Sequence, residues 1–331
     1  MPAIKMSVVI CTYNRAQNVA DLLEGLLMQE TAPDCPFEIL VVDNNSKDKT
    51  KETIESYISK FQGRLRCFFE PRQGKSFALN LGIGESRGEI LAFTDDDCLV
   101  PGDYIARVHQ VFREYGETDF MGGRILPHWE QEKRPSWLAE VLLDNTEYEL
   151  SHERYWRRMF FRGPLGILDY GEKPFRVDST QKLYRSFLFY GANMAIKKSA
   201  FDKVGGFAAD RVVTQDTEMC LRLVKSGMKG LYAPNVKVSH RVPAGRLTPE
   251  YYHQWYSKRG KFLEMDGFIR KKLYHPLGIP AEFILKTCIF FIRSLAARSM
   301  QDKVYYRCRV LSNLAQMAQI AKGTLFKRRR S

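Results

Sequence analysis

Three consecutive aspartates follow a hydrophobic run in the first third of the sequence. The run covers residues 90–94, and the aspartates are Asp95, Asp96 and Asp97. Adjacent carboxylates repel one another unless a cation lies between them, and hard divalent ions such as Mg2+ and Mn2+ prefer carboxylate and phosphate oxygens. The triplet therefore predicts a metal site that holds a diphosphate. Capping of the helix expected near Pro101 is the alternative, and it would need only one of the three side chains.

The first half of the chain alternates between strand and helix patterns, and these elements must position the triplet. The patterns predict strands at residues 6–11, 37–42, 65–69 and 89–93, and helices at 16–28, 47–61 and 76–86. Such runs favour right-handed βαβ units in an α/β fold, with a mixed, mainly parallel sheet and helices on both faces. Polar loops begin at Thr12, Asp43 and Asp95, where three of the strands end. Because ligands of such sheets bind beyond the strand carboxyl ends, we expect these loops to converge on one site.

The second half is less regular. Residues 123–185 are rich in aromatic and basic side chains, which predicts a variable insertion over the site. Tyr and Trp can stack on sugar rings or lipid headgroups, and packing in a core is the alternative. A strand pattern returns at residues 189–196, and the chain has a helical pattern beyond Pro243.

Composition and charge narrow the class of protein. The chain has 331 residues, 44% of them hydrophobic and 27% charged, as expected of a folded globular protein. Seven scattered cysteines form neither a CxxC pair nor a disulfide framework, which indicates reduced thiols. The N-terminus has none of the features of a secretory signal, so we expect the protein in the cytoplasm.

The whole positive excess lies in the last part of the chain. Residues 246–331 contain 18 Lys and Arg and 5 Asp and Glu, a surplus equal to the formal net charge of +13. The apolar stretch at residues 283–295 is interrupted by Lys286 and Arg293 and is shorter than the roughly 20 residues of a spanning helix. This pattern predicts peripheral association with an anionic membrane surface, the inner face of the plasma membrane. A solvated basic tail is the alternative; no nucleic-acid partner is expected, because no recognised binding motif accompanies the charge.

Five segments, taken together, resemble the family 2 glycosyltransferases with the GT-A fold. They are SVVICTYNR at 7–15, VVDNNS at 41–46, the triplet, GANMA at 191–195 with GGF at 205–207, and QDTEMCLR at 215–222. Their order and spacing fit the family over about residues 5–242. The resemblance implies a Rossmann-like catalytic domain at residues 1–245, with residues 123–185 on its acceptor side and a basic helical region at 246–331. It also implies a metal-dependent inverting transfer from a nucleotide-sugar donor, expected to be a UDP-sugar, to a polysaccharide or lipid-linked glycan.

The resemblance assigns the base and ribose of the donor to the first two loops. The residues are Thr12, Tyr13, Asn14, Arg15 and Asp43. A carboxylate at Asp43 can accept the N3–H of uracil, and Tyr13 can cover a base face. An N-cap role for Asp43 and a packing role for Tyr13 are the alternatives.

Other positions match the remainder of the family's donor site. They are Lys75, which can meet a phosphate, Asn80 on the following helix, Gly191 and Asn193 under the transferred sugar, and Asp96 in the triplet. Asp96 is expected to point away from its two neighbours in an extended segment. Lys75 can equally be solvated surface, and Gly191 a simple turn.

The resemblance also implies the metal ligands. Asp97 matches the direct ligand, Asp95 lies nearer the ribose or sugar, and His240 after a late strand is a third ligand. Mg2+ and Mn2+ suit these ligands equally. A structural role for a lone histidine is the alternative.

Asp216 matches the family's general base. Relatives present Glu-Asp at the start of a helix that continues to an arginine, whereas this chain has Gln215-Asp216 with Arg222 downstream. Glu218 is close enough to compete for the role, and Asp216 as an N-cap is the structural alternative.

Two other functions remain open at this point. A nucleotidyltransferase would want a glycine-rich phosphate loop after the first strand, and residues 12–15 contain no glycine. A noncatalytic nucleotide- or membrane-binding partner of a glycan assembly system would not require a base.

Overall fold

The structure is a computed structural model that describes residues 3–31, 34–131, 134–138, 152–180, 189–209, 214–263 and 281–328. The chain divides into two compact units. The sheet unit contains Met1–His128 and Gly166–Arg241, and the helical unit contains Trp129–Asn145, Leu150–Leu165 and Val242–Ser331. The predicted domain boundary at residue 245 stays a prediction.

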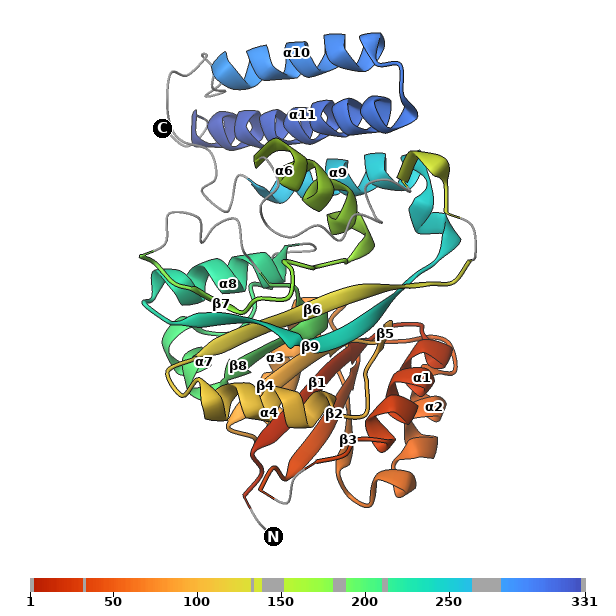
Figure 1. Ribbon diagram of the computed structural model, residues 1–331, viewed down its shortest axis with the longest axis vertical. Helices are drawn as coiled ribbons and strands as arrows, with labels where there is room; N and C mark the ends of the chain where they lie inside the picture. The colour runs from red at the N-terminus through yellow and green to blue at the C-terminus, as the bar shows by residue number, and fades with distance from the viewer. Residues whose placement is uncertain are drawn as a thin grey trace. The chain divides into compact units, whose positions relative to one another are not determined.

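Four parallel strands form the first half of the sheet (Figure 1). They are β1 (Met6–Thr12), β2 (Phe37–Asp43), β3 (Leu65–Phe69) and β4 (Ile90–Asp95), in the order β3-β2-β1-β4. The register sets Thr12 beside Asp43 and Cys11 beside Asp95. The carboxyl ends of β1, β2 and β4 therefore meet at one edge, as the polar loops predicted.

Helices cover this half of the sheet. They are α1 (Ala16–Leu27), α2 (Thr50–Tyr57), α3 (Lys75–Glu85) and α4 (Tyr104–Glu114). The strand order reverses between β3 and β4, so right-handed crossovers put α3 on the face opposite α1 and α2. All seven residues of β2 are buried, as expected of a strand covered on both faces. The helix predicted at 47–61 is shorter: α2 ends at Tyr57, and a 3-10 turn, η1 (Ser59–Phe61), follows.

The second half of the sheet is antiparallel. Its strands are β5 (Cys98–Leu99), β6 (Phe120–Trp129), β7 (Phe175–Val177), β8 (Met194–Lys197) and β9 (Gly230–Val242). β8 pairs with β4, and β6 and β9 continue the sheet to β5. The insertion predicted from residue 123 was wrong at its start, because residues 123–129 belong to β6. The strand predicted at 189–196 is a 3-10 turn, η4 (Gly191–Asn193), followed by β8, α7 (Lys198–Val204) and, after residues outside the described ranges, α8 (Gln215–Lys225).

Aromatic packing holds the helical unit together. Its elements are α6 (His152–Arg162), η2 (Gly163–Leu165), η5 (Ala244–Leu247), α9 (Pro249–Leu263), α10 (Ala281–Ala296) and α11 (Met300–Arg328). The Phe160 ring stacks on Tyr256 with centroids 4.1 Å apart. Trp137 packs edge-on against both Phe161 and Tyr252, and the rings of Phe161 and Tyr252 are tilted against each other. These aromatic residues of the predicted insertion therefore pack in a core, which was the alternative to stacking on an acceptor. Among the described helices, none is long and apolar enough to cross a bilayer.

Two glycines of α3 offer a test of how tightly this helix packs on the sheet. A Cβ at Gly82 would lie 2.5 Å from Val9 Cγ1, whereas a Cβ at Gly84 would have no atom of the described residues within 4 Å. We expect Gly82→Ala to lower the free energy of unfolding by about 1–3 kcal/mol through overpacking. Gly84→Ala, with the same gain in helix propensity, should raise it by up to about 1 kcal/mol. Urea unfolding of both variants measures the difference; equal effects would contradict the close packing.

Candidate active site

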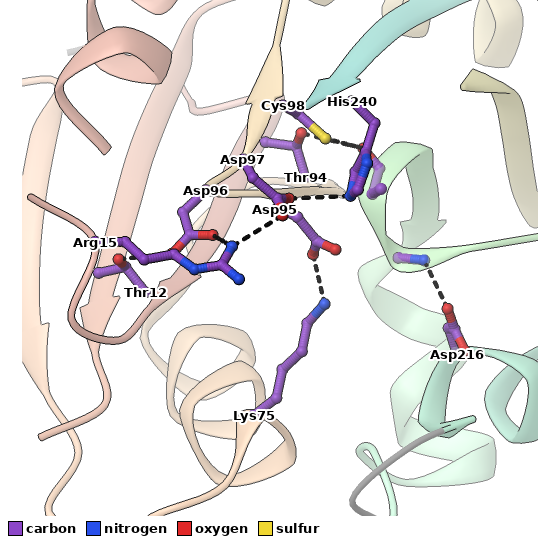
Figure 2. Close-up of polar contacts among 12 residues, drawn as sticks. Thr12, Arg15, Lys75, Thr94, Asp95, Asp96, Asp97, Cys98, Asp216 and His240 are labelled. Atoms are coloured by element: carbon purple, nitrogen blue, oxygen red, sulfur yellow. Dashed lines mark hydrogen bonds and ion pairs between the residues drawn. The ribbon is translucent and has the colours of Figure 1, made fainter. Parts of the chain in front are cut away.

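The three aspartates lie at the end of β4, but they are not extended. Asp95 is the last residue of β4, and Asp96 and Asp97 form the turn that leads into β5. The extended segment predicted for Asp96 was therefore wrong. In a turn, successive side chains need not alternate between faces, so the three carboxylates reach different sets of partners (Figure 2).

Asp96 is buried against the first loop. Its carboxylate accepts hydrogen bonds from Thr12 Oγ1 at 2.8 Å and from Arg15 Nη1 at 2.7 Å. Burial raises the pKa of Asp96 to about 6, and the charge of Arg15 opposes that rise. Thr12 and Arg15, two residues predicted to bind the nucleotide, thus hold the side chain of Asp96, which is another predicted donor-site residue.

Asp97 links two elements. Its Oδ2 lies 2.9 Å from Arg15 Nη1, and its Oδ1 lies 3.1 Å from His240 Nε2 on β9. Arg15 therefore bridges Asp96 and Asp97. Burial lowers the pKa of Arg15, but the two carboxylates raise it by more, so the pKa lies above its usual value.

Asp95 pairs with the lysine at the start of α3. Lys75 Nζ lies 2.5 Å from Asp95 Oδ1. Burial lowers the pKa of Lys75, but Asp95 and the more distant Asp216 raise it, and the net shift is upward. Lys75 is therefore bound to the triplet, and the solvated-surface alternative does not describe it.

The side chains of Asp95, Asp97 and His240 fit a divalent cation. Each offers one ligand atom, and the three atoms lie within 4.8 Å of one another. Two carboxylates and an imidazole are ligands that Mg2+ and Mn2+ accept. His240 is buried, and its Nδ1 has no hydrogen-bond partner among the described residues. Gly166, at φ +72°, lies so close that a Cβ there would be 2.9 Å from His240 Cε1, which confines the imidazole ring.

Asp216 lies in the first turn of α8. Its Oδ2 accepts the backbone N–H of Gly191 at 3.1 Å, and its Oδ1 accepts the N–H of Thr217 at 2.7 Å. Burial raises the pKa of Asp216, and Lys75 is the main opposing charge. Glu218, its predicted competitor, pairs instead with Arg222 at 2.9 Å, so it is already neutralised within the helix.

The first two loops are tied to each other. Asn14, at φ 52°, donates its backbone N–H to Ser46 Oγ, and its Oδ1 accepts the N–H of Lys47. Asp43 is buried and accepts the N–H of Ser46. Tyr13 is 44% exposed, so its ring is available to cover a flat ligand.

Two predicted donor residues have partners away from the triplet. Asn80 donates to the carbonyl of Phe207 and accepts its N–H. Asn193 is buried and donates to the carbonyls of Arg124 and Val236. Both side chains brace backbone segments of the sheet unit.

One supporting residue escaped the sequence reasoning. Asn44 is buried, donates to the carbonyls of Glu70 and Arg72, and accepts the N–H of Gly74. It thereby shapes the loop that presents Lys75. Its place in the VVDNNS motif, directly after Asp43, was the available signal.

Comparisons with known proteins identify the family and support the fold. The family described as Glycosyl transferase family 2 matches residues 7–205, and Glycosyl transferase family group 2 matches residues 172–316. The first match covers more than half of the chain, so this protein belongs to glycosyl transferase family 2. The predicted family and the predicted enzyme class, a glycosyltransferase, are confirmed.

Individual relatives are more distant. The glycosyltransferase AglE of Haloferax volcanii is 35% identical over 120 residues, which are 36% of this chain and only 39% of that protein. A glucosyl-dolichyl phosphate glucuronosyltransferase of the same organism is 24% identical over 273 residues, 77% of each chain. The mannosyltransferase PcManGT of Pyrobaculum calidifontis, solved with GDP-Man and Mn2+, has a TM-score of 0.57 at 19% identity and covers 98% of this chain and 87% of its own. The last likeness confirms the predicted fold class.

A metal titration tests the cluster. We expect Mn2+ to raise the thermal unfolding midpoint of the protein and EDTA to reverse the rise, because a ligand that binds only the folded state stabilises it by mass action. His240→Ala should need at least about tenfold more Mn2+ for the same rise. His128→Ala, an exposed histidine of β6, is the matched control. Indistinguishable titrations of the two variants would exclude His240 as a ligand.

Proposed function

We propose that this chain is a metal-dependent inverting glycosyltransferase. Its donor is a nucleotide sugar, with a UDP-sugar as the expected class, and its acceptor is a polysaccharide or lipid-linked glycan. The observation that carries the proposal is the arrangement around Lys75. Its ammonium contacts Asp95 of the metal-ligand cluster, and its charge also acts on Asp216.

The names of the relatives support the choice of substrates. One is a glucuronosyltransferase named for a glucosyl-dolichyl phosphate, and the fold neighbour was solved with a guanine nucleotide sugar and Mn2+. Because the fold neighbour's donor carries guanine whereas the expected class for this chain is a UDP-sugar, the nucleotide base is a matter for experiment. Peripheral membrane association and a cytoplasmic location stay predictions.

Asp216 is suited to accept a proton. Two backbone N–H groups hold its carboxylate in one orientation, so no side-chain reorganisation is needed at the moment of reaction. The acceptor hydroxyl gives its proton to Asp216 while its oxygen forms a bond to C1 of the donor sugar. The C1–oxygen bond to the diphosphate breaks, and the electron pair leaves on the phosphate oxygen. Attack from the opposite face inverts C1.

The residues around the aspartate triplet are suited to stabilise the negative charge of the diphosphate. A divalent cation held by Asp95, Asp97 and His240 would neutralise the charge that develops on the departing diphosphate. Arg15 keeps Asp96 and Asp97 together in the turn. Lys75 supplies a positive charge between this region and the base, where it can meet a phosphate.

Substitution of the base separates the transferase from a noncatalytic binding partner. We expect Asp216→Asn to reduce donor hydrolysis by about 10²–10⁴-fold, the usual contribution of a general base. Thermal stabilisation by the same donor and Mn2+ should be retained. The donor for this assay is first identified with a panel of UDP-, GDP- and dTDP-sugars. The control variant is Asp202→Asn, a substitution elsewhere in the sheet unit. Unchanged hydrolysis in the Asp216 variant would sink the catalytic assignment.

The pH profile tests the coupling between Lys75 and Asp216. The base works only when it is deprotonated, and burial raises its pKa above the ordinary 3.8, so the acid limb of the rate should lie above that pH. Lys75 lowers the pKa of Asp216, so Lys75→Met should move the limb to still higher pH. Lys75→Arg keeps the charge and should leave the limb near its wild-type position. An acid limb that Lys75→Met does not move would show that the two groups are uncoupled.

A further inference from the structure

Helix α10 exposes several large apolar side chains. Leu285, Ile292 and Leu295 are 62%, 64% and 71% exposed, and Cys288 and Ile289 are exposed as well. These positions are spaced three and four residues apart, so they lie on one face of the helix. Contiguous apolar surface of this kind is uncommon on monomeric soluble proteins and marks a site of interaction.

The opposite face of α10 packs on its neighbour. Figure 1 shows α10 beside α11, with α9 across α11 from α10. Thr287 Oγ1 accepts a hydrogen bond from Asn313 Nδ2 at 3.0 Å, and the Phe290 ring stacks near Tyr306 at 6.3 Å. The packed face thus contains a polar pair beside the Phe290 ring, while several aliphatic side chains point outward. A helix that only completes a core would instead bury most of its aliphatic side chains.

Basic side chains run along the edge of the exposed face. Lys286 and Arg293 are seven residues apart and exposed, and the Arg293 guanidinium lies 5.9 Å from the Tyr306 ring. Arg298 follows just beyond the helix, also exposed. Long basic side chains beside an apolar stripe can reach anionic headgroups while the stripe enters the acyl region. The surplus of positive charge in residues 246–331 has the same sign.

We propose that α10 docks on an anionic phospholipid surface through the face formed by Leu285, Cys288, Ile289, Ile292 and Leu295. The helix lies in the plane of the surface, with Lys286 and Arg293 at the headgroups. The charge beside the stripe is what favours a lipid surface over a second copy of this chain, since two identical basic edges would repel one another. The proposal is independent of glycosyl transfer, because binding to a surface needs neither donor nor metal.

Flotation of the full chain with phosphatidylcholine vesicles, with and without phosphatidylglycerol, tests the proposal. We expect binding to the anionic vesicles, and at least about tenfold weaker binding for the double variant Leu285→Glu/Ile292→Glu. Lys286→Gln should weaken binding about fivefold on anionic vesicles only. Met28→Glu, at an apolar position of the sheet unit that is 69% exposed, is the matched control and should bind like the wild type. Because the substituted side chains are exposed, we expect the variants to fold like the wild type. Equal thermal unfolding midpoints would verify this.

Three results would overturn the proposal. They are failure of the wild type to float with either vesicle, flotation of the double variant equal to that of the wild type, and binding that does not depend on phosphatidylglycerol. Sedimentation velocity tests the competing occupant, a second copy of this chain. A dimer that the double variant dissociates, in a chain that does not float, would assign this face to contact between copies.

Discussion

The repulsion between three adjacent carboxylates is the constraint around which the sheet unit is organised. The turn after β4 gathers Asp95, Asp96 and Asp97, and each needs compensation. The groups that pair with these carboxylates come from three elements far apart in the sequence: Arg15 after β1, Lys75 at the start of α3 and His240 on β9. A parallel sheet makes this feasible, because its strands deliver their following loops to one edge.

The same charges give chemically alike side chains different roles. Asp96 is enclosed by donors from the chain and has its pKa raised by burial, so it serves the architecture of the turn. Asp97 and Asp95 keep ligand atoms close to His240. Asp216 has the same chemistry as these three, but two backbone N–H groups and Lys75 set its environment. Position relative to cations, rather than residue type, separates these carboxylates.

The sequence allowed prediction of whatever depends on local pattern. Strands β1 to β4 were recognisable because they are short runs of apolar residues followed by polar loops, and those loops marked the site. Strand β6 was missed at residues 123–129, because Gly122, Gly123 and Pro127 weaken a strand pattern. The partners of Arg15 could not be read from the sequence either, since 81 and 82 residues separate it from Asp96 and Asp97. For Asn80 and Asn193 the motifs identified the positions but not the interactions. Their side chains donate hydrogen bonds to backbone carbonyls, which the sequence pattern does not reveal.

The pairing of β5 with β9 has a consequence for how the protein is made. This pairing sets Cys98 opposite His240, and so brings the imidazole to Asp97 from the last strand of the sheet. During synthesis, Asp95 and Asp97 emerge long before His240 does. The cluster of Asp95, Asp97 and His240 is therefore complete only after the final strand has been translated and has closed the sheet, since such non-local pairings form late. Capture of a cation by all three ligands would then be coupled to completion of the fold, so that nascent chains bind metal less tightly than finished ones.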